Sequence, residues 1–83
     1  MSTKDKLVKR FKSLPSDFTF DELVRLFNLL GFELDNKGAT SGSRVQFVKG
    51  ENVFYMHRPH PQNTVKVVCL RKAKKYLKKV KAL

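Results

Sequence analysis

Residues Gly42–Pro61, GSRVQFVKGENVFYMHRPHP, decide the fold of this chain and contain both of its histidines and two of its three prolines. Within them, Arg44–Lys49 alternates polar with apolar side chains, which is typical of a half-buried strand. Asn52–His57 is a second run rich in β-forming residues. The intervening Gly50 and Glu51 suit a two-residue type II′ turn, which favours glycine at its first central position. The stretch therefore predicts an antiparallel β-hairpin.

The predicted turn also fixes which residues of the two strands face each other. With Lys49 opposite Asn52, the ladder pairs Phe47 with Phe54 and ends with Arg44 opposite His57. One face of the hairpin is apolar and must be covered: Val45, Phe47, Phe54 and Met56. The other face is polar, and we predict that it is the working surface: Arg44, Gln46, Tyr55 and His57.

Two prolines end the second strand, because proline cannot donate a hydrogen bond to a sheet. Pro59 and Pro61 therefore place Arg58 and His60 just beyond the strand, on the side of Arg44. We expect both histidines and these two arginines to converge there.

The size and composition of the chain predict a single domain, residues 1–83, in the cytoplasm. Eighty-three residues support one small core. The only cysteine, Cys69, can form no internal disulfide, and an unpaired thiol fits a reducing compartment. We find no signal peptide and no apolar run near the roughly 20 residues of a membrane span, so we expect a soluble chain.

The net charge of +11 is concentrated near the two ends of the chain. Met1–Ser13 has five basic residues and one acidic residue, Leu14–Val65 has five and six, and Lys66–Leu83 has eight and none. Basic segments on either side of a nearly neutral middle favour a polyanionic partner. Nucleic acid is the first expectation, and an acidic protein follows. An anionic membrane surface is the weaker option, because the core uses the apolar face of the last basic helix, so we expect no membrane partner.

Two helices are predicted before the hairpin. Thr3–Leu14 carries an apolar stripe at helical spacing: Leu7, Val8, Phe11 and Leu14. Thr19, followed three residues later by Glu22, forms a capping box that opens a second helix, which Gly31 closes. Its apolar face consists of Phe20, Leu23, Val24, Phe27 and Leu30, widened by Leu26 and Leu29. We expect this second helix to be the centre of the core.

The remaining segments complete an α+β fold with the order α-α-β-β-β-α. Phe32–Asp35 predicts a first strand, and Asn36–Ser43 predicts a loop. A last helix is expected from about Val68 to Val80, with five residues facing inward: Cys69, Ala73, Tyr76, Leu77 and Val80. The predicted architecture is a three-stranded antiparallel sheet with the helices on its apolar face.

Most catalytic signatures are missing from the sequence. It contains no glycine-rich phosphate loop, nucleophile elbow or Cys/His metal-binding spacing. His57 and His60 have no third ligand, so we predict neither a metal nor a small-molecule cofactor. Two interpretations of His57 remain: an exposed strand residue, or a base that takes the proton of an RNA 2′-hydroxyl while Arg44 or Arg58 balances the phosphate charge.

The outer face of the last helix is basic and fits phosphate groups. A solvated lysine face is the alternative, but eight basic residues without an acidic one favour RNA. The predicted RNA-binding residues are Ser43, Gln46, Tyr55, Arg58, Lys66, Arg71, Lys72, Lys75 and Lys79.

The order of several short motifs resembles the HicA toxin family. Gly42-Ser43 is followed by a strand, a turn and a strand, then by His60-Pro61 and a helix that contains Leu70-Arg71-Lys72. The resemblance covers residues 19–80 and leaves 1–14 as an extra helix. It implies a fold like the double-stranded-RNA-binding domain, metal-independent cleavage of mRNA, arrest of translation, and an acidic HicB-like antitoxin as partner.

One position departs from the family pattern. The resemblance places a catalytic histidine directly after the Gly-Ser pair, where this chain has Arg44. Arginine stays protonated near neutral pH and cannot act as a base. Either His57, with His60 as the acid, carries out the proton transfers, or the protein is a non-catalytic RNA- or ribosome-binding module. A DNA-binding protein that uses the last helix is a third possibility.

Overall fold

The computed structural model describes residues 3–35, 44–59 and 63–83, so that the predicted site residues Ser43 and His60 lie outside the described part. The elements are α1 (Thr3–Lys12), α2 (Phe20–Leu29), β1 (Glu33–Asp35), β2 (Arg44–Lys49), β3 (Asn52–His57) and α3 (Val67–Lys79). The predicted α+β fold and its element order are confirmed. Within the described residues, no helix combines the length and the apolar character that a membrane crossing requires.

The three strands form one antiparallel sheet in the order β1-β2-β3. The predicted register of the hairpin is confirmed, with Lys49 opposite Asn52 and Arg44 opposite His57. Gly50 has a φ of 58°, the left-handed value that a type II′ turn requires at its first central residue. The turn chemistry therefore determines which side chains share a face.

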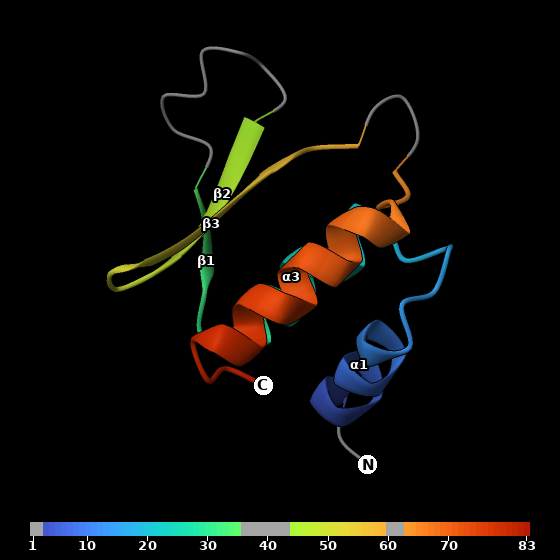
Figure 1. The fold of residues 1–83 in the computed structure, drawn as a ribbon, viewed down its shortest axis with the longest axis horizontal. Helices are drawn as coiled ribbons and strands as arrows, with labels where there is room; N and C mark the ends of the chain where they lie inside the picture. Colours follow the sequence, from blue (N-terminus) through green and yellow to red (C-terminus); the bar gives the residue numbers. More distant parts are fainter. Residues whose placement is uncertain (1–2, 36–43, 60–62) are drawn as a thin grey trace.

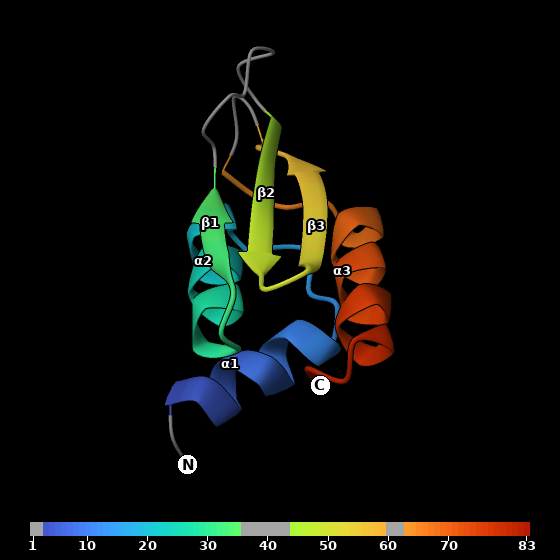
Figure 2. The same ribbon diagram turned by 90° about the vertical axis from the view of Figure 1, so that its left-hand side faces the viewer.

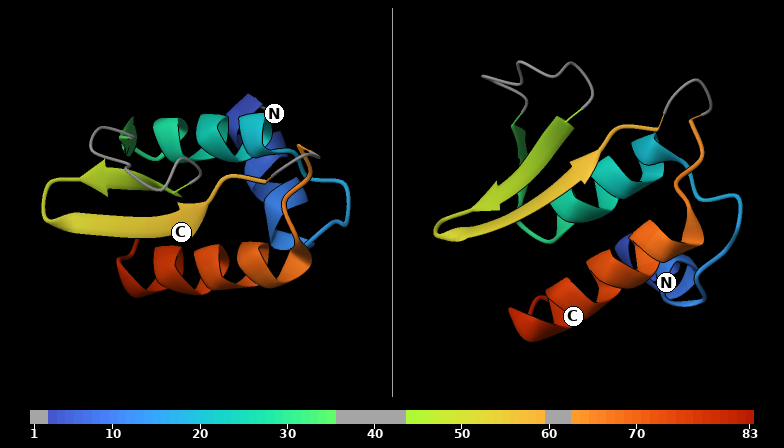
Figure 3. Two further views of the ribbon diagram at one scale, coloured as in Figure 1. Left: turned by 90° about the horizontal axis from the view of Figure 1, so that it is seen from above. Right: turned by 45° about the horizontal axis from the view of Figure 1, so that its top comes forward.

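The helices cover one face of the sheet and leave the other open. In Figure 1 the strands lie at one side of the molecule and the helices at the other, and Figure 2 looks onto the uncovered face. From this direction α2 lies behind β1, α3 runs beside β3, and α1 crosses below both helices. The left view of Figure 3, seen from above, shows β2 and β3 between α2 on one side and α3 on the other.

Aromatic rings fill the space between the helices and the sheet. The Phe27 ring of α2 stacks on Phe47 of β2 with a centroid distance of 4.1 Å and an interplanar angle of 6°. Phe54 lies 5.7 Å from Phe27 and 5.2 Å from Tyr76 of α3, so that both helices share the same aromatic cluster. The predicted apolar face of the hairpin thus forms one side of the hydrophobic core.

Helix α2 has the predicted signals at both ends. The Glu22 amide donates to the Thr19 hydroxyl at 3.1 Å, and the Thr19 amide donates to the Glu22 carboxylate at 3.0 Å, which completes the capping box. At the other end Gly31 has a φ of 94°, and the Phe32 amide bonds back to the Phe27 carbonyl at 2.8 Å.

The first strand begins one residue later than predicted. Phe32 does not join the sheet ladder, because its amide closes the end of α2 and its side chain is buried in the core. Strand β1 therefore starts at Glu33, which pairs with Val48.

Helix α1 packs across α2 and α3 through Leu7 and Phe11, and it ends at Lys12 rather than at the predicted Leu14. The Ser13 hydroxyl donates to the Arg10 carbonyl at 2.6 Å, and Leu14 has a left-handed φ of 53°. Both features stop the helix before Leu14. The extra N-terminal segment is therefore a helix docked on the core.

Helix α3 begins at Val67, and its predicted inward face is confirmed in part. Ala73 and Leu77 are buried as predicted, and Leu70 is buried as well. The other predicted residues, Cys69, Tyr76 and Val80, are only partly buried and pack against the core. On α2, Leu29 is 39% exposed and does not widen the buried face as expected. In both helices, the way in which the helix packs against its neighbours determines which of its apolar residues are buried.

An ion pair ties α1 to the start of α2 and gives a pH prediction. The Arg10 Nε donates to the Glu22 carboxylate at 3.0 Å. This bond and the Thr19 bonds lower the pKa of Glu22 below its ordinary value of 4.5, against the opposing effect of burial. A lowered folded pKa means that the stabilisation is complete above the unfolded pKa and is lost as the pH falls through the folded pKa.

We expect Glu22→Gln to lower the free energy of unfolding at neutral pH and to flatten its decrease on acidification. Chemical denaturation at a series of pH values below 7 measures both effects. Glu51→Gln removes the same charge from an exposed turn and is the matched control. An acid slope in Glu22→Gln equal to that of the wild type would contradict the prediction.

Candidate functional site

Four predicted site residues share the open face of the sheet. Arg44 and His57 are cross-strand partners at one end of the hairpin, and Gln46 pairs with Tyr55 next to them. The Arg44 guanidinium lies over the Tyr55 ring, 4.9 Å from its centroid. Arg44, Tyr55 and His57 are exposed, so a cation, an aromatic ring and an imidazole are available to one ligand.

A hydrogen bond within the sheet holds Gln46. Its amide nitrogen donates to the Asp35 carboxylate of β1 at 3.0 Å. This bond fixes the orientation of the Gln46 side chain beside Tyr55. The face is thus ordered by contacts between neighbouring strands.

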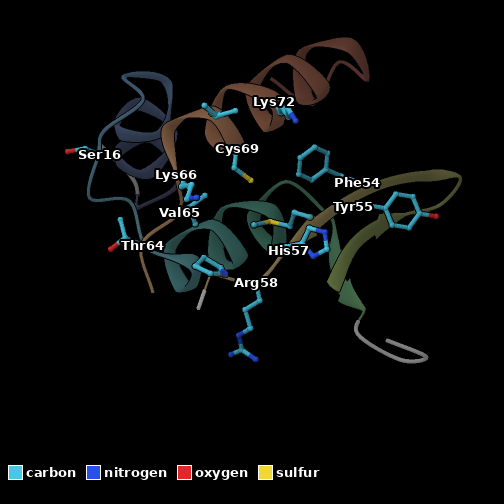
Figure 4. Close-up of a pocket in the computed structure, with 13 residues that line it drawn as sticks. Ser16, Phe54, Tyr55, His57, Arg58, Thr64, Val65, Lys66, Cys69 and Lys72 are labelled. Atoms are coloured by element: carbon cyan, nitrogen blue, oxygen red, sulfur yellow. The ribbon is translucent and has the colours of Figure 1, made fainter. Parts of the chain in front are cut away.

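Arg58 follows β3, and its guanidinium lies 5.3 Å from the centroid of the Phe20 ring. In Figure 4 its side chain points away from the opening between β3 and α3. The structure therefore brings Arg44 and His57 together and places Arg58 against α2. His60 is also predicted to lie near Arg44, but it is outside the described residues.

A pocket of about 720 Å³ lies between the second half of β3 and the first turns of α3. Predicted site residues line it from both elements: Tyr55, His57, Arg58, Lys66 and Lys72. Phe54, Met56 and Cys69 also line it, although their spacing predicts all three in the core; Met56 is a buried core residue, and the other two are partly buried against the core. Their periodicity showed an inward direction but could not show a gap between the two elements.

Cys69 is the one thiol of the chain, and its sulfur points into this pocket (Figure 4). Burial raises the pKa of Cys69, and the nearby Lys72 ammonium opposes that shift. The sulfur is therefore a weakly acidic thiol at neutral pH.

The remaining cations of α3 lie outside the pocket. Arg71, Lys75 and Lys79 are exposed along the helix and continue the positive surface that Lys72 begins. Lys74 differs from its neighbours, because its ammonium donates to the Lys12 carbonyl at 3.1 Å and thereby holds α1. The predicted RNA-binding cations of α3 are therefore exposed, whereas Lys74 turns toward α1.

The described part of the chain contains no group of three His, Cys, Asp or Glu side chains that could hold a metal ion.

Comparison with models of known protein families assigns the chain to one of them. A family model described as the HicA toxin of bacterial toxin-antitoxin matches residues 20–80. The chain belongs to the HicA toxin family. Searches of curated proteins and of solved structures gave no match.

The HicA match runs from the start of α2 to the end of α3, so α1 lies outside it. The sheet and its open face lie within the matched residues, and so do all the residues that line the pocket except Ser16. The resemblance inferred from the order of the sequence motifs is confirmed. As a member of this family, the chain is a toxin of a toxin-antitoxin system.

Proposed function

We propose that this HicA toxin binds mRNA on the open face of its sheet, cleaves it without a metal and thereby arrests translation. The observation that carries the proposal is the grouping of Arg44, Tyr55 and His57 on one exposed face. The family match supports a toxin, and these three side chains fit RNA as its target.

The chemistry of each side chain matches one part of a nucleotide. An exposed tyrosine ring offers a surface on which an unpaired base stacks, and a guanidinium binds phosphate oxygens in a bidentate manner. Because Arg44 already lies over Tyr55, a base and its phosphate can be held side by side. The imidazole of His57 is next to the same phosphate position, as the cross-strand partner of Arg44.

The cleavage step uses the RNA itself as the nucleophile. His57 takes the proton of the 2′-hydroxyl, the 2′-oxygen attacks the adjacent phosphorus, and the bond from phosphorus to the 5′-oxygen breaks. Arg44 stabilises the negative charge that develops on the phosphoryl oxygens. The 5′-oxygen leaves with a proton from an acid, a role that we propose for His60. The products are a cyclic phosphate and a 5′-hydroxyl.

Arg44 also supports a second candidate function, RNA binding without cleavage. It occupies the position where the family resemblance implies a catalytic histidine, and it cannot accept a proton near neutral pH. A chain that had lost this base would still bind RNA through the same face. Cleavage assays on position 44 and position 57 variants, given in the Discussion, separate the two functions.

We expect the basic face of α3 to carry much of the RNA affinity. Replacing Lys72, Lys75 and Lys79 together with Gln should weaken binding and lower the slope of log affinity against log salt by about 2, because each lost phosphate contact on single-stranded RNA removes roughly 0.7. Binding titrations at several salt concentrations measure affinity and slope together.

The matched control removes three lysines from α1. Lys4, Lys6 and Lys9 are exposed, so their replacement by Gln changes the net charge by the same amount in a helix outside the family match. Equal loss of affinity in both triple variants would mean that net charge, and not the α3 surface, drives binding.

We also propose an acidic antitoxin as the protein partner, because a toxin of charge +11 requires its basic surface to be masked while it is silent. Expression of the chain alone should arrest growth, and co-expression with an acidic antitoxin, to be sought in the neighbouring reading frame, should restore growth and give a complex that co-purifies. Normal growth and translation with the unpartnered chain would remove this support for the proposal.

A further inference from the structure

The pocket between β3 and α3 has an apolar interior that is open to solvent. Phe54 and Cys69 lie on facing elements, and the buried Val65, which is 1% exposed, also lines the pocket. Val68 at the rim is 60% exposed, among the most exposed large apolar side chains of the described residues. Figure 4 shows the Cys69 sulfur directed into the opening, with Phe54 and His57 across from it. A small planar apolar group bound in the pocket would cover these apolar side chains.

The edge of β3 gives the pocket a polar wall made of backbone. In an antiparallel hairpin, alternate residues turn their amide and carbonyl groups toward the partner strand and away from it. Lys49 and Asn52 close the two-residue turn as a hydrogen-bonded pair, so the next pair, Val48 and Val53, is not hydrogen-bonded, and Val53 turns its backbone away from β2. Tyr55 and His57 lie two and four residues further along β3 and therefore direct their backbone groups to the same edge, where the pocket lies.

The rim of the pocket is positively charged. Lys66 and Lys72 line it from the start of α3, and both are exposed. The lining contains no carboxylate among the described residues. An anionic ligand is therefore favoured at the rim, while the interior favours an uncharged apolar ring.

We propose that this pocket holds one unstacked nucleobase of a single-stranded RNA. The ring would lie between Phe54 and Cys69, its polar edge would meet the backbone of Tyr55 and His57, and the flanking phosphates would meet Lys66 and Lys72. The volume of about 720 Å³ lies in the range of small-molecule sites, roughly 300–1,000 Å³, and accommodates a base with its ribose. This inference rests on the proposed RNA function and adds a subsite that reads a base beside His57.

The test uses Cys69 as a reporter. A thiol-alkylating reagent is applied at a fixed, mildly alkaline pH to the protein with a short single-stranded RNA, or with an abasic oligonucleotide of equal length and charge. Both oligonucleotides are used at saturation, and fluorescence anisotropy measures their binding separately. A base in the pocket covers the sulfur, so the base-bearing RNA should slow alkylation by about tenfold, in line with stacking contributions to single-strand binding. The abasic oligonucleotide should leave the rate nearly unchanged.

A variant with a filled pocket provides the second measurement. Because Val68 is 60% exposed, Val68→Trp can be introduced without disturbing the core, and its ring would occupy the rim. In this variant the ratio of the affinity for base-bearing RNA to the affinity for abasic RNA should fall by about tenfold. Leu29→Trp adds the same ring at a 39% exposed site on α2 and should keep the preference.

The possible outcomes separate the pocket from the general RNA function. Equal protection of Cys69 by both oligonucleotides, with normal binding of both, would overturn the base pocket and leave RNA binding intact. An unchanged preference in Val68→Trp would overturn it as well. Absence of binding by either oligonucleotide would overturn the proposed RNA function itself.

Discussion

Replacing His57 with alanine should lower the rate of RNA cleavage by about 100- to 10,000-fold, the usual contribution of a general base. His57 is exposed at the end of β3, and its removal takes no atom from the core, so folding and RNA affinity should be nearly unchanged. The measurement is single-turnover cleavage of a long RNA in excess chelator. Persistence of wild-type cleavage in the chelator checks that no metal is required.

Two further variants distinguish the roles at this site. His60→Ala should slow cleavage if this side chain protonates the leaving oxygen, and Arg44→His restores the residue type that the family resemblance implies at that position. Full activity in both alanine variants would remove histidine catalysis from the proposal. Cleavage that appears only in Arg44→His would identify the natural chain as an RNA-binding protein that does not cut.

Phe47→Ala should have the largest effect on stability, with a loss of about 3–5 kcal/mol of unfolding free energy. Phe47 is fully buried in the central strand of the sheet. The centroid of its ring lies 4.1 Å from that of Phe27, on which it stacks, and 6.5 Å from that of Phe20. Removing its ring therefore leaves a cavity between the sheet and α2. Urea or guanidinium denaturation measures the loss.

Tyr55→Ala is the matched control, since it removes an aromatic ring from the same sheet at a residue that is 54% exposed. Its cost should stay near or below about 1 kcal/mol, as for most surface substitutions. Similar losses in the two variants would contradict the assignment of Phe47, rather than Tyr55, to the core.

The hairpin shows how far local rules reach in this protein. Side chains alternate in a strand, and a glycine turn of two residues permits one pairing, so the placement of Arg44 opposite His57 follows from residues close in sequence. The capping box at Thr19 and Glu22 is also a contact over three residues. Sequence alone therefore determined the element order, the open face and the residues on it.

The pocket depended on contacts between residues far apart in the sequence. Whether Cys69 enters the core or lines a gap is set by how α3 lies against β3, and periodicity gives only the inward side of each element. In the same way, Leu70 rather than Cys69 is buried, Arg58 lies on Phe20, and Lys74 bonds to α1. Each of these outcomes follows from the packing of α3, α2 and the sheet, because local sequence fixes the direction of a side chain but not what lies opposite it.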